Sequence, residues 1–313
     1  MIRLVIRRLL LGIPLVLIVA TVAFFLVQLT PGSPAAAVLG TQATPEAVAR
    51  FEASLGLDRP VLEQYAEYMG QLLTLNLGES WLTRESVSSL LASRLPVTVS
   101  LATLATIVAM VIGILIGTVA AVRGGVLDRI LTAVSGFGLA LPNFWLASIL
   151  VLVFSLELGW FPATGYVDFA RNPAAWALHL VLPVTTLAVA MVASFARQTR
   201  TGMLEQLSSD YVRTLVGAGT SRTSVIWRHT LRNAAGPVVN TAGLLFVGVL
   251  GGAVIIEQVF ALPGIGRVIV QSASTRDLPV LLGAVVVSAI VVLAINILVD
   301  VIVALLNPRA RTS

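Results

Sequence analysis

Few side chains in this sequence have the chemistry to make or break bonds. All 20 basic residues are arginine, and neither lysine nor cysteine occurs. A phosphate-binding P-loop places a lysine on the phosphates, so we expect no ATP hydrolysis by that route from this chain. Without cysteine there are no disulfides, thiol nucleophiles or cysteine metal sites. The two histidines, His179 and His229, lie fifty positions apart with no cluster of ligand-type residues around them, so we expect neither a catalytic nor a metal site.

The composition instead indicates a membrane protein. Of 313 residues, 57% are hydrophobic and 11% are charged, and the mean hydropathy is +0.96. An ordinary soluble domain carries roughly a quarter of its residues as charges, and disorder requires low hydrophobicity. Both classes are therefore excluded. The sequence pI of about 10.6 reflects arginines beside apolar runs, a pattern that more often sets membrane topology than binds nucleic acid.

Uncharged runs long enough to cross a bilayer define the expected architecture. About 20 apolar residues cross the hydrocarbon core. Six runs meet this length, namely 9–29, 97–122, 130–156, 172–196, 233–256 and 278–299. The first run is longer than the core of a signal peptide, so we interpret it as a retained helix. Two Gly-x-x-x-Gly pairs, Gly113 with Gly117 and Gly248 with Gly252, have a spacing that permits close helix packing but is frequent by chance. The predicted fold is all-α, with six transmembrane helices.

The arginines also predict the orientation of the spans. If the N-terminus is inside, 13 of the 20 arginines fall in inner segments, and the outer segment 30–96 has four arginines against seven acids. The positive-inside rule then places both termini in the cytoplasm.

Two of the connecting segments are long enough for a function of their own. The outer segment is expected to contain one helix that begins after Thr44 and stops at Gly56, and another over 60–73. These helices either pack on the outer ends of the spans or bind a partner. The inner segment 197–232, here called the coupling segment, holds six arginines and predicts a helix over about 203–216, a turn at 217–219, and a second helix capped at Thr220 or Ser221 that reaches Leu231. A basic segment that only touches anionic lipid is the alternative.

The coupling segment is where this chain resembles a known family. Its residues resemble the "EAA" segment of permeases from ATP-binding-cassette importers, in the dipeptide, oligopeptide and nickel branch. The matching residues are Asp210-Tyr211-Val212-Arg213-Thr214, Gly219, and Arg228-His229-Thr230-Leu231-Arg232-Asn233. Further matches follow in the family's order at Leu29-Thr30-Pro31-Gly32, Leu55-Gly56-Leu57-Asp58, Leu141-Pro142-Asn143-Phe144-Trp145, Glu257-Gln258-Val259-Phe260 and Pro263-Gly264-Ile265-Gly266-Arg267. Leu215, Gly217, Ala218 and Ser33 depart from the family's usual residues.

The resemblance implies a B-type subunit with the type I importer permease fold and no ATPase site of its own. The implied cargo is a di- or oligopeptide, with nickel chelates, glutathione or haem as alternatives. The implied partners are a second permease, two ATP-binding subunits that hold ATP and Mg, and an extracytoplasmic substrate-binding protein, all at the bacterial cytoplasmic membrane. In this organisation 1–30 form a tail and the first helix, 31–96 the outer helical loop, 97–306 the permease core, and 307–313 a cytoplasmic tail.

The resemblance assigns two groups of candidate residues, and an interrupted helix adds a third. ATPase coupling is assigned to Asp210, Tyr211, Val212, Arg213, Thr214, Gly219, Arg228, His229, Leu231, Arg232 and Asn233, with Tyr211 and Val212 as apolar anchors and an Asp210–Arg213 pair across the interface. The translocation path has the candidates Pro142, Asn143 and Trp145 on a separate ground, because a proline that interrupts a span at mid-depth is typical of helices that line a path; an ordinary helix kink packed against its neighbours is the alternative. Contact with the binding protein is assigned to Glu257, Phe260, Pro263, Gly264 and Gly266.

Other transport classes fit the residues less well. A secondary transporter usually carries ionisable residues within its spans, whereas Glu257 and Asp300 lie near the ends of the expected spans. A channel would need a filter motif or a ring of charges, and neither is present in the sequence.

Overall fold

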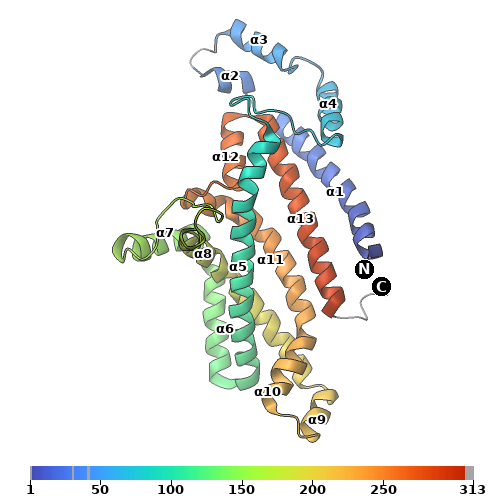
Figure 1. Cartoon of the computed structure of the whole chain (residues 1–313), viewed down its shortest axis with the longest axis vertical. Coiled ribbons are helices and arrows are strands. Elements are labelled where there is room, and N and C mark those ends of the chain that lie inside the picture. The colour runs from blue at the N-terminus through green and yellow to red at the C-terminus, as the bar shows by residue number, and fades with distance from the viewer. Residues whose placement is uncertain (1, 30–31, 41–42, 307–313) are drawn as a thin grey trace. The chain divides into compact units, whose positions relative to one another are not determined.

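The computed structural model describes residues 2–29, 32–40 and 43–306, so Thr30, Pro31 and the expected tail 307–313 lie outside the described residues. Helices dominate the described chain, and a single antiparallel bridge joins Glu79 to Ser86. The helices in chain order are α1 (Ile2–Gln28), α2 (Pro34–Leu39), α3 (Pro45–Ser54), α4 (Val61–Leu73), α5 (Val87–Arg123), α6 (Gly125–Ala140), α7 (Asn143–Leu150), η2 (Val151–Glu157), α8 (Pro173–Leu207), α9 (Asp210–Gly217), α10 (Arg222–Ser224), η3 (Val225–Thr230), α11 (Leu231–Val259), α12 (Ile265–Thr275) and α13 (Leu278–Leu306) (Figure 1). The predicted all-α class is confirmed.

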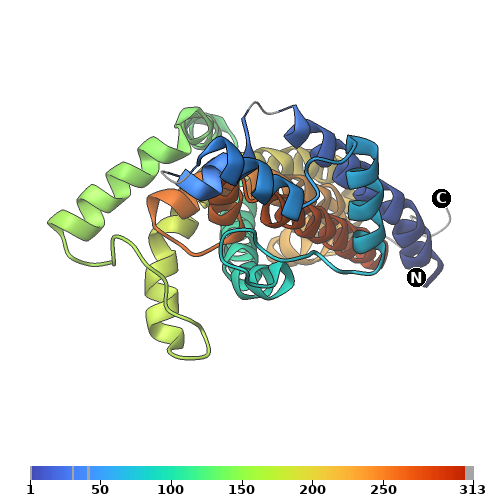
Figure 2. The ribbon, with the colours of Figure 1, turned by 90° about the horizontal axis from the view of Figure 1, so that it is seen from above.

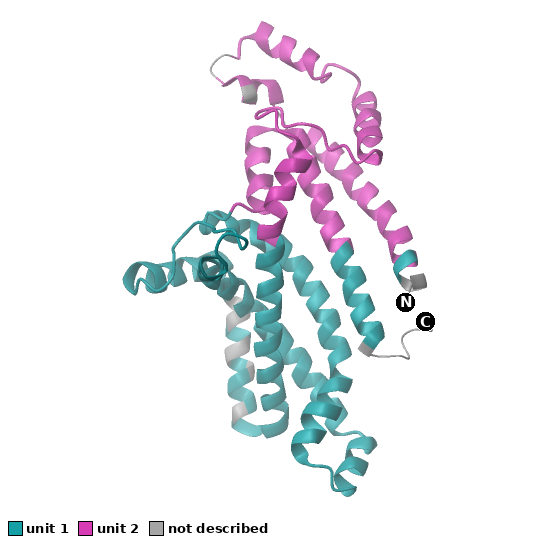
Figure 3. Cartoon of the chain, viewed as in Figure 1, with its two compact units in different colours: residues 1–6, 99–262, 294–313 teal, residues 7–98, 263–293 magenta. Residues whose placement is uncertain are grey.

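The chain divides into two compact units (Figure 3). Unit 1 comprises residues 1–6, 99–262 and 294–313, and unit 2 comprises 7–98 and 263–293. Each unit is therefore built from segments that are far apart in the sequence.

Five helical stretches are long and apolar enough to cross a membrane. They are Val5–Gln28, Val87–Arg123, Pro173–Leu207, Arg222–Val259 and Leu278–Leu305, and they cover five of the six predicted spans. The remaining predicted span, 130–156, is wrong as a continuous helix, because Leu141 and Pro142 have extended backbone angles that separate α6 from α7. In Figure 2, α6 is seen nearly end-on while α7 and η2 lie across the view. Proline has no N–H and disfavours a helical residue before it, which favours an interruption at this position. Proline alone does not decide between a kink and a break, since Pro14, Pro96, Pro183 and Pro237 lie inside continuous helices.

Unit 1 is organised around α8. This helix packs against α6, α7 and α11, and its buried face includes Leu180, Leu187 and Phe195. The helix is capped by Asn172, whose side chain accepts a hydrogen bond from the N–H of Ala175 at 3.1 Å. Asparagine is a preferred N-cap because its side-chain oxygen satisfies an N–H group that has no partner within the helix.

Unit 2 contains the helices of the outer segment. Thr44 caps α3 by accepting a hydrogen bond from the N–H of Ala47 at 3.2 Å, and Gly56 follows the helix with a φ of +68°. The second expected helix is present as α4 (Val61–Leu73). Leu72 of this helix packs in a small apolar cluster with Ala20 and Val286. Both helices lie where the sequence predicts them; α4 buries Leu72, whereas no residue of α3 is fully buried.

Candidate functional site

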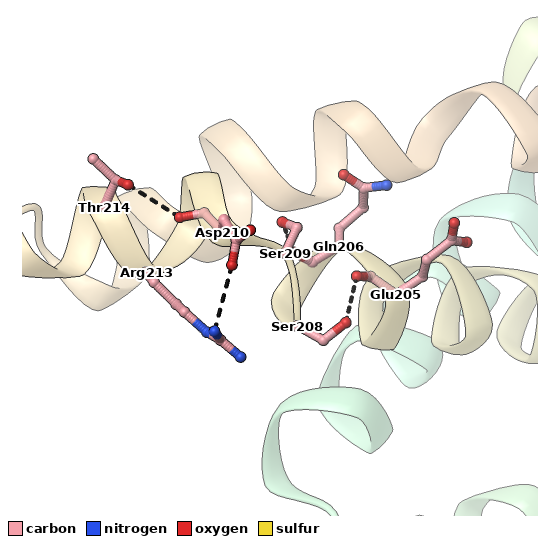
Figure 4. Close-up of polar contacts among 7 residues, drawn as sticks. All are labelled: Glu205, Gln206, Ser208, Ser209, Asp210, Arg213 and Thr214. Atoms are coloured by element: carbon pink, nitrogen blue, oxygen red, sulfur yellow. Dashed lines mark hydrogen bonds and ion pairs between the residues drawn. The ribbon is translucent and has the colours of Figure 1, made fainter.

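The coupling segment begins where α8 ends. The predicted single helix over 203–216 is wrong, since α8 ends at Leu207 and α9 starts at Asp210. The hydroxyl groups of the two intervening serines donate hydrogen bonds to backbone oxygens of the preceding turn. Ser208 donates to the carbonyl oxygen of Glu205 at 2.8 Å, and Ser209 has an extended ψ of 152° (Figure 4). Serine side chains that bind nearby backbone compete with helix continuation, which explains the break.

The charged residues of α9 face solvent. Asp210 and Arg213 form an ion pair with N and O atoms 3.4 Å apart, and their side chains are 96% and 77% exposed (Figure 4). The hydroxyl of Thr214 donates to the backbone oxygen of Asp210 at 3.1 Å. An exposed pair one turn apart contributes little to stability. These three side chains are therefore displayed on the surface, and the predicted pair across an interface lies within α9 itself.

The turn after α9 is a complete Schellman motif. The N–H of Gly219 donates to the oxygen of Val216, and the N–H of Thr220 donates to the oxygen of Leu215, both at 3.0 Å. Gly219 has a φ of +77°, in the left-handed region that glycine enters without a steric penalty. The turn chemistry predicted for this position is thus present, and it fixes the direction in which the chain leaves α9.

The inner face of α9 is apolar and lies over a cavity of about 340 Å³. Val212 is 6% exposed and lines this cavity, together with Leu207, Val216, Val225 and Ile226 among others. Tyr211 donates its hydroxyl to the side-chain oxygen of Gln206 at 3.1 Å. Val212 is therefore buried within the coupling segment, whereas Val216, which lines the same cavity, is 60% exposed.

The second half of the coupling segment is continuous with the next span. Ser221 caps it, and α10, η3 and α11 follow without a break from Arg222 to Val259. The predicted helix end at Leu231 is therefore wrong. The stretch Val225–Thr230 is π-helical, a geometry that is frequent at functional sites. Of the remaining coupling candidates, Arg228, Arg232 and Asn233 are exposed, while His229 and Leu231 are half-buried.

Close contacts join the coupling end of α8 to its neighbours in unit 1. The guanidinium of Arg200 binds the carboxylate of Asp128 in α6 through two hydrogen bonds of 2.5 and 2.6 Å. A Cβ atom built on Gly117 of α5 would lie 2.7 Å from the Cβ of Thr199 and 3.0 Å from the backbone nitrogen of Arg200. A Cβ atom built on Gly113 would likewise lie 3.0 Å from the backbone oxygen of Val192. These two glycines therefore permit close packing of α5 on α8.

Gly248 and Gly252, the second Gly-x-x-x-Gly pair, do not permit a close helix contact of this kind within the single chain. A Cβ on Gly248 would meet no atom within 4 Å, and one on Gly252 would be 3.7 Å from the side-chain nitrogen of Asn143. Asn143 consequently lies beside α11, at the break that Pro142 creates. Trp145 is 49% exposed. The three path candidates thus surround a helix break in unit 1.

The outer candidates fall into two environments. Glu257 and Phe260 are 0% and 1% exposed at the end of α11, and the oxygen of Phe260 accepts a hydrogen bond from Gly165 N–H at 2.9 Å. Their burial fits a structural role. Pro263 and Gly264 belong to unit 2 and line a cavity beside α12, while Gly266 is buried in its first turn.

The same cavity is lined by Arg94 and Arg267, which the sequence reasoning did not select. These arginines are 173 positions apart, so no sequence spacing could have connected them. Helix α12 itself was also not predicted.

Metal binding has no support in the described part of the chain. No group of three or more His, Cys, Asp or Glu side chains is placed to hold an ion there. His179 instead has its Nδ1 atom 2.8 Å from the backbone oxygen of Ala175, one helical turn earlier.

Comparison with known proteins identifies the family. Residues 109–312 match the family described as "Binding-protein-dependent transport system inner membrane component", and residues 1–102 match the N-terminal domain of the same membrane components. The chain belongs to this family of permease subunits of ATP-binding-cassette importers, which are integral proteins of the bacterial inner membrane.

Relatives align over nearly their full lengths. A peptide transport system permease protein of Brucella abortus is 42% identical over 309 residues, which are 98% of each chain. The oligopeptide transport system permease protein AppB of Bacillus subtilis is 36% identical over 97% of this chain and 98% of its own. The glutathione transport system permease protein GsiC of Salmonella choleraesuis is 38% identical over 99% of both.

A solved structure shows the same fold. The methionine ABC transporter MetNI, in an inward-facing conformation, contains a chain that aligns with a TM-score of 0.58 and 19% identity, over 70% of this chain and 97% of that one. The type I importer permease fold is thereby confirmed.

Proposed function

We propose that this chain is the permease subunit of an ATP-driven peptide importer and that its coupling segment docks on a separate ATPase subunit. The observation that carries the proposal is the coupling segment, in which α9 displays Asp210, Arg213 and Thr214 on its exposed face and ends in a Schellman turn at Gly219. Full-length similarity to permeases named for peptide and oligopeptide transport supports the cargo class. Glutathione is itself a short peptide, so the similarity to GsiC makes it the second candidate cargo.

The assembly follows from the family and from the absence of lysine. This chain would form the pathway with a second permease, and ATP and Mg would be bound by two partner subunits. A binding protein on the outer face would deliver the peptide. The arginine distribution supports an N-terminus and C-terminus on the cytoplasmic side, with 31–96 outside and 197–232 inside.

Cysteine labelling tests the orientation directly, because the native chain has no cysteine. Ser88 and Ser221 are both exposed in the structure. A cysteine at Ser88 should react with an impermeant maleimide from outside in whole cells, and one at Ser221 only after the membrane is opened. The reverse pattern would contradict the proposed topology.

The docking role is tested by Asp210→Arg. This change places a second positive charge on the exposed helix α9, beside that of Arg213, and leaves the buried face of α9 intact, so the chain should fold and insert normally. We expect co-purification of the ATPase subunits and uptake of labelled dipeptide to fall together, at least tenfold. Glu85→Arg is the matched control, because it makes the same charge change at an exposed position of the outer segment.

Two results would argue against the proposal. Full assembly and full uptake with Asp210→Arg would mean that the coupling segment only sets topology. Uptake of glutathione but of no other di- or oligopeptide by the wild-type complex would replace the first cargo class with the second.

A further inference from the structure

Two arginines at the base of α11 are available to an outside anion. Arg228 and Arg232 are exposed, and neither forms an ion pair or a side-chain hydrogen bond with another described residue. No acidic residue lies between Asp210 and Glu257, so the stretch between them carries only positive formal charge. A guanidinium stays charged in proteins and presents its N–H donors in a fixed fork. The chain itself therefore supplies no counter-charge to these two forks.

The length of the helix places both arginines at the edge of the bilayer. Arg222–Val259 is one helix of 38 residues, about 57 Å long at 1.5 Å per residue. The hydrocarbon core is about 30 Å thick, with about 5–8 Å of headgroups on each side. The uncharged run 233–256 fills the core, so Arg232 lies at its edge and Arg228 lies about 6 Å further out. Both guanidinium groups consequently fall in the headgroup layer.

The neighbouring side chains suit this depth. Residues about one turn apart lie on the same face of a helix, so the forks of Arg228 and Arg232 can reach one ligand together. Trp227, next to Arg228, is 44% exposed. Tryptophan is enriched where the hydrocarbon meets the headgroups, because its ring is largely apolar and its N–H is polar. An exposed tryptophan beside two unpaired arginines is typical of a surface that contacts lipid.

The part of the coupling segment that faces the cytosol is separate from this surface. The cavity beneath α9 is bordered by Val225 and Ile226 of the helix, and neither Arg228 nor Arg232 lines it. Arg222, at the start of the helix, precedes Arg232 by ten residues and lies about 15 Å further from the core. A cytosolic subunit that binds the exposed face of α9 therefore meets a different part of the segment from the part at the headgroups.

We propose that Arg228 and Arg232 bind the phosphate of an anionic phospholipid in the inner leaflet. This rests on the proposed function, which places 197–232 on the cytoplasmic side. Anionic lipids attract basic residues next to a span, and arginine forks match the geometry of a phosphate. A zwitterionic lipid is held less well, because its own ammonium group offsets the phosphate charge. Arg228 and Arg232, which the family resemblance assigns to ATPase coupling, would instead hold the π-helical turn at the membrane surface.

Photocrosslinking tests the site directly. The complete importer complex is placed in phosphatidylcholine nanodiscs that contain phosphatidylglycerol with a photoreactive headgroup, and crosslinks are mapped by mass spectrometry. The wild type should crosslink at the segment around Trp227 more strongly with this probe than with an equally photoreactive phosphatidylcholine. Arg228→Gln and Arg232→Gln should each lower the phosphatidylglycerol yield about fivefold, the effect of one basic residue at an anionic surface, and leave the phosphatidylcholine yield unchanged.

The matched control is Arg222→Gln. It removes an exposed arginine from the same helix, but at a position outside the headgroup layer, so the yield should stay within twofold of wild type. Arg228→Lys keeps the charge but lacks the fork and should give an intermediate yield. Because Arg228 and Arg232 are exposed, their variants should fold, and co-purification of the ATPase subunits checks that the complex has assembled.

The outcomes separate the lipid site from the proposed function. Wild-type yield in both glutamine variants, or equal yields from the two probes in the wild type, would overturn the inference. Loss of the ATPase subunits from these variants with an unchanged phosphatidylglycerol yield would also overturn it, because the arginines would then bind the ATPase. The expected order of yields in a wild-type complex that takes up no peptide would refute the proposed function and leave the lipid site standing.

Discussion

The turn at Gly219 offers the sharpest test of how the coupling segment is built. Gly219 has a φ of +77°, and a Cβ atom built on it meets no other atom within 4 Å. Gly217, two residues earlier, also has open space around such a Cβ but is helical. The two positions therefore differ in backbone conformation and not in crowding, so alanine at each isolates the conformational effect.

The magnitudes follow from backbone preferences. A non-glycine residue in the left-handed region costs about 1–2 kcal/mol. Replacing a helical glycine by alanine gains about 0.5–1 kcal/mol. Gly219→Ala should therefore loosen the turn, whereas Gly217→Ala should tighten it. Gly219→Asn should fall between Gly219→Ala and the wild type, because asparagine tolerates this region better.

Hydrogen exchange measures the turn directly. The Gly219 and Thr220 amides of the wild type each donate to a carbonyl of α9. A loss of about 1–2 kcal/mol should speed exchange of the Thr220 amide by roughly 5- to 30-fold in Gly219→Ala, since 1.4 kcal/mol corresponds to a factor of ten. Gly217→Ala should slow it.

Equal exchange of Thr220 in the two alanine variants would refute the reasoning, because the left-handed conformation would then carry no energetic weight. If α9 docks on an ATPase subunit, uptake should follow the same order as protection. If Gly217→Ala abolishes uptake while the Thr220 amide stays fully protected from exchange, the docking surface includes Gly217 itself.

Two further matched pairs test the packing. Gly117→Ala should destabilise the chain by about 1–3 kcal/mol, because the added Cβ meets backbone atoms of α8 that cannot move aside. Gly248→Ala adds its Cβ in open space, so the thermal unfolding temperature of the isolated chain should stay unchanged or rise. Equal effects of Gly117→Ala and Gly248→Ala on thermal unfolding would contradict the close contact of Gly117 with α8. Tyr68→Phe should not lower the stability of the chain, since the Tyr68 hydroxyl is buried without a hydrogen-bond partner among the described residues. Tyr65→Phe should lower the free energy of unfolding by about 1 kcal/mol, because it removes the 2.9 Å hydrogen bond to Thr21. Burial, with a smaller effect of Tyr65, raises the pKa of Tyr68 to about 12, so stability should be lost as pH rises from about 10 to 12 in the wild type and less so in Tyr68→Phe. An ultraviolet titration of both proteins checks this difference.

Local patterns predicted much of the fold. The apolar runs gave five of the spans, and cap residues such as Thr44 placed the outer helices, because both signals depend on neighbours in the sequence. Gly219 was also predictable, since glycine after an amphipathic stretch indicates a left-handed helix end.

The structure differs from the predictions where competing local effects or contacts between distant segments decide the conformation. At Ser208 and Ser209, hydroxyls compete with the helix for backbone groups, and a uniform helical pattern hides that competition. Pro142 indicated an interruption, but the pattern could not distinguish a kink from the break that turns α7 away from α6. The cavity formed by Arg94 and Arg267 depends on contacts between distant segments, and no pattern in one sequence reports these.

The two ends of the coupling segment differ in a way that bears on how movement would pass through it. On the side of α8, the Asp128–Arg200 pair and the close approach of Gly117 tie the helix to α6 and α5. On the other side, the chain runs from Arg222 to Val259 as one helix with a π-helical turn at its base. Such turns are frequent at functional sites and are places where a helix bends. If α9 docks on an ATPase subunit, its displacement would therefore carry α5, α6 and α8 together, while the π-helical turn is the place where α11 can adjust to that movement.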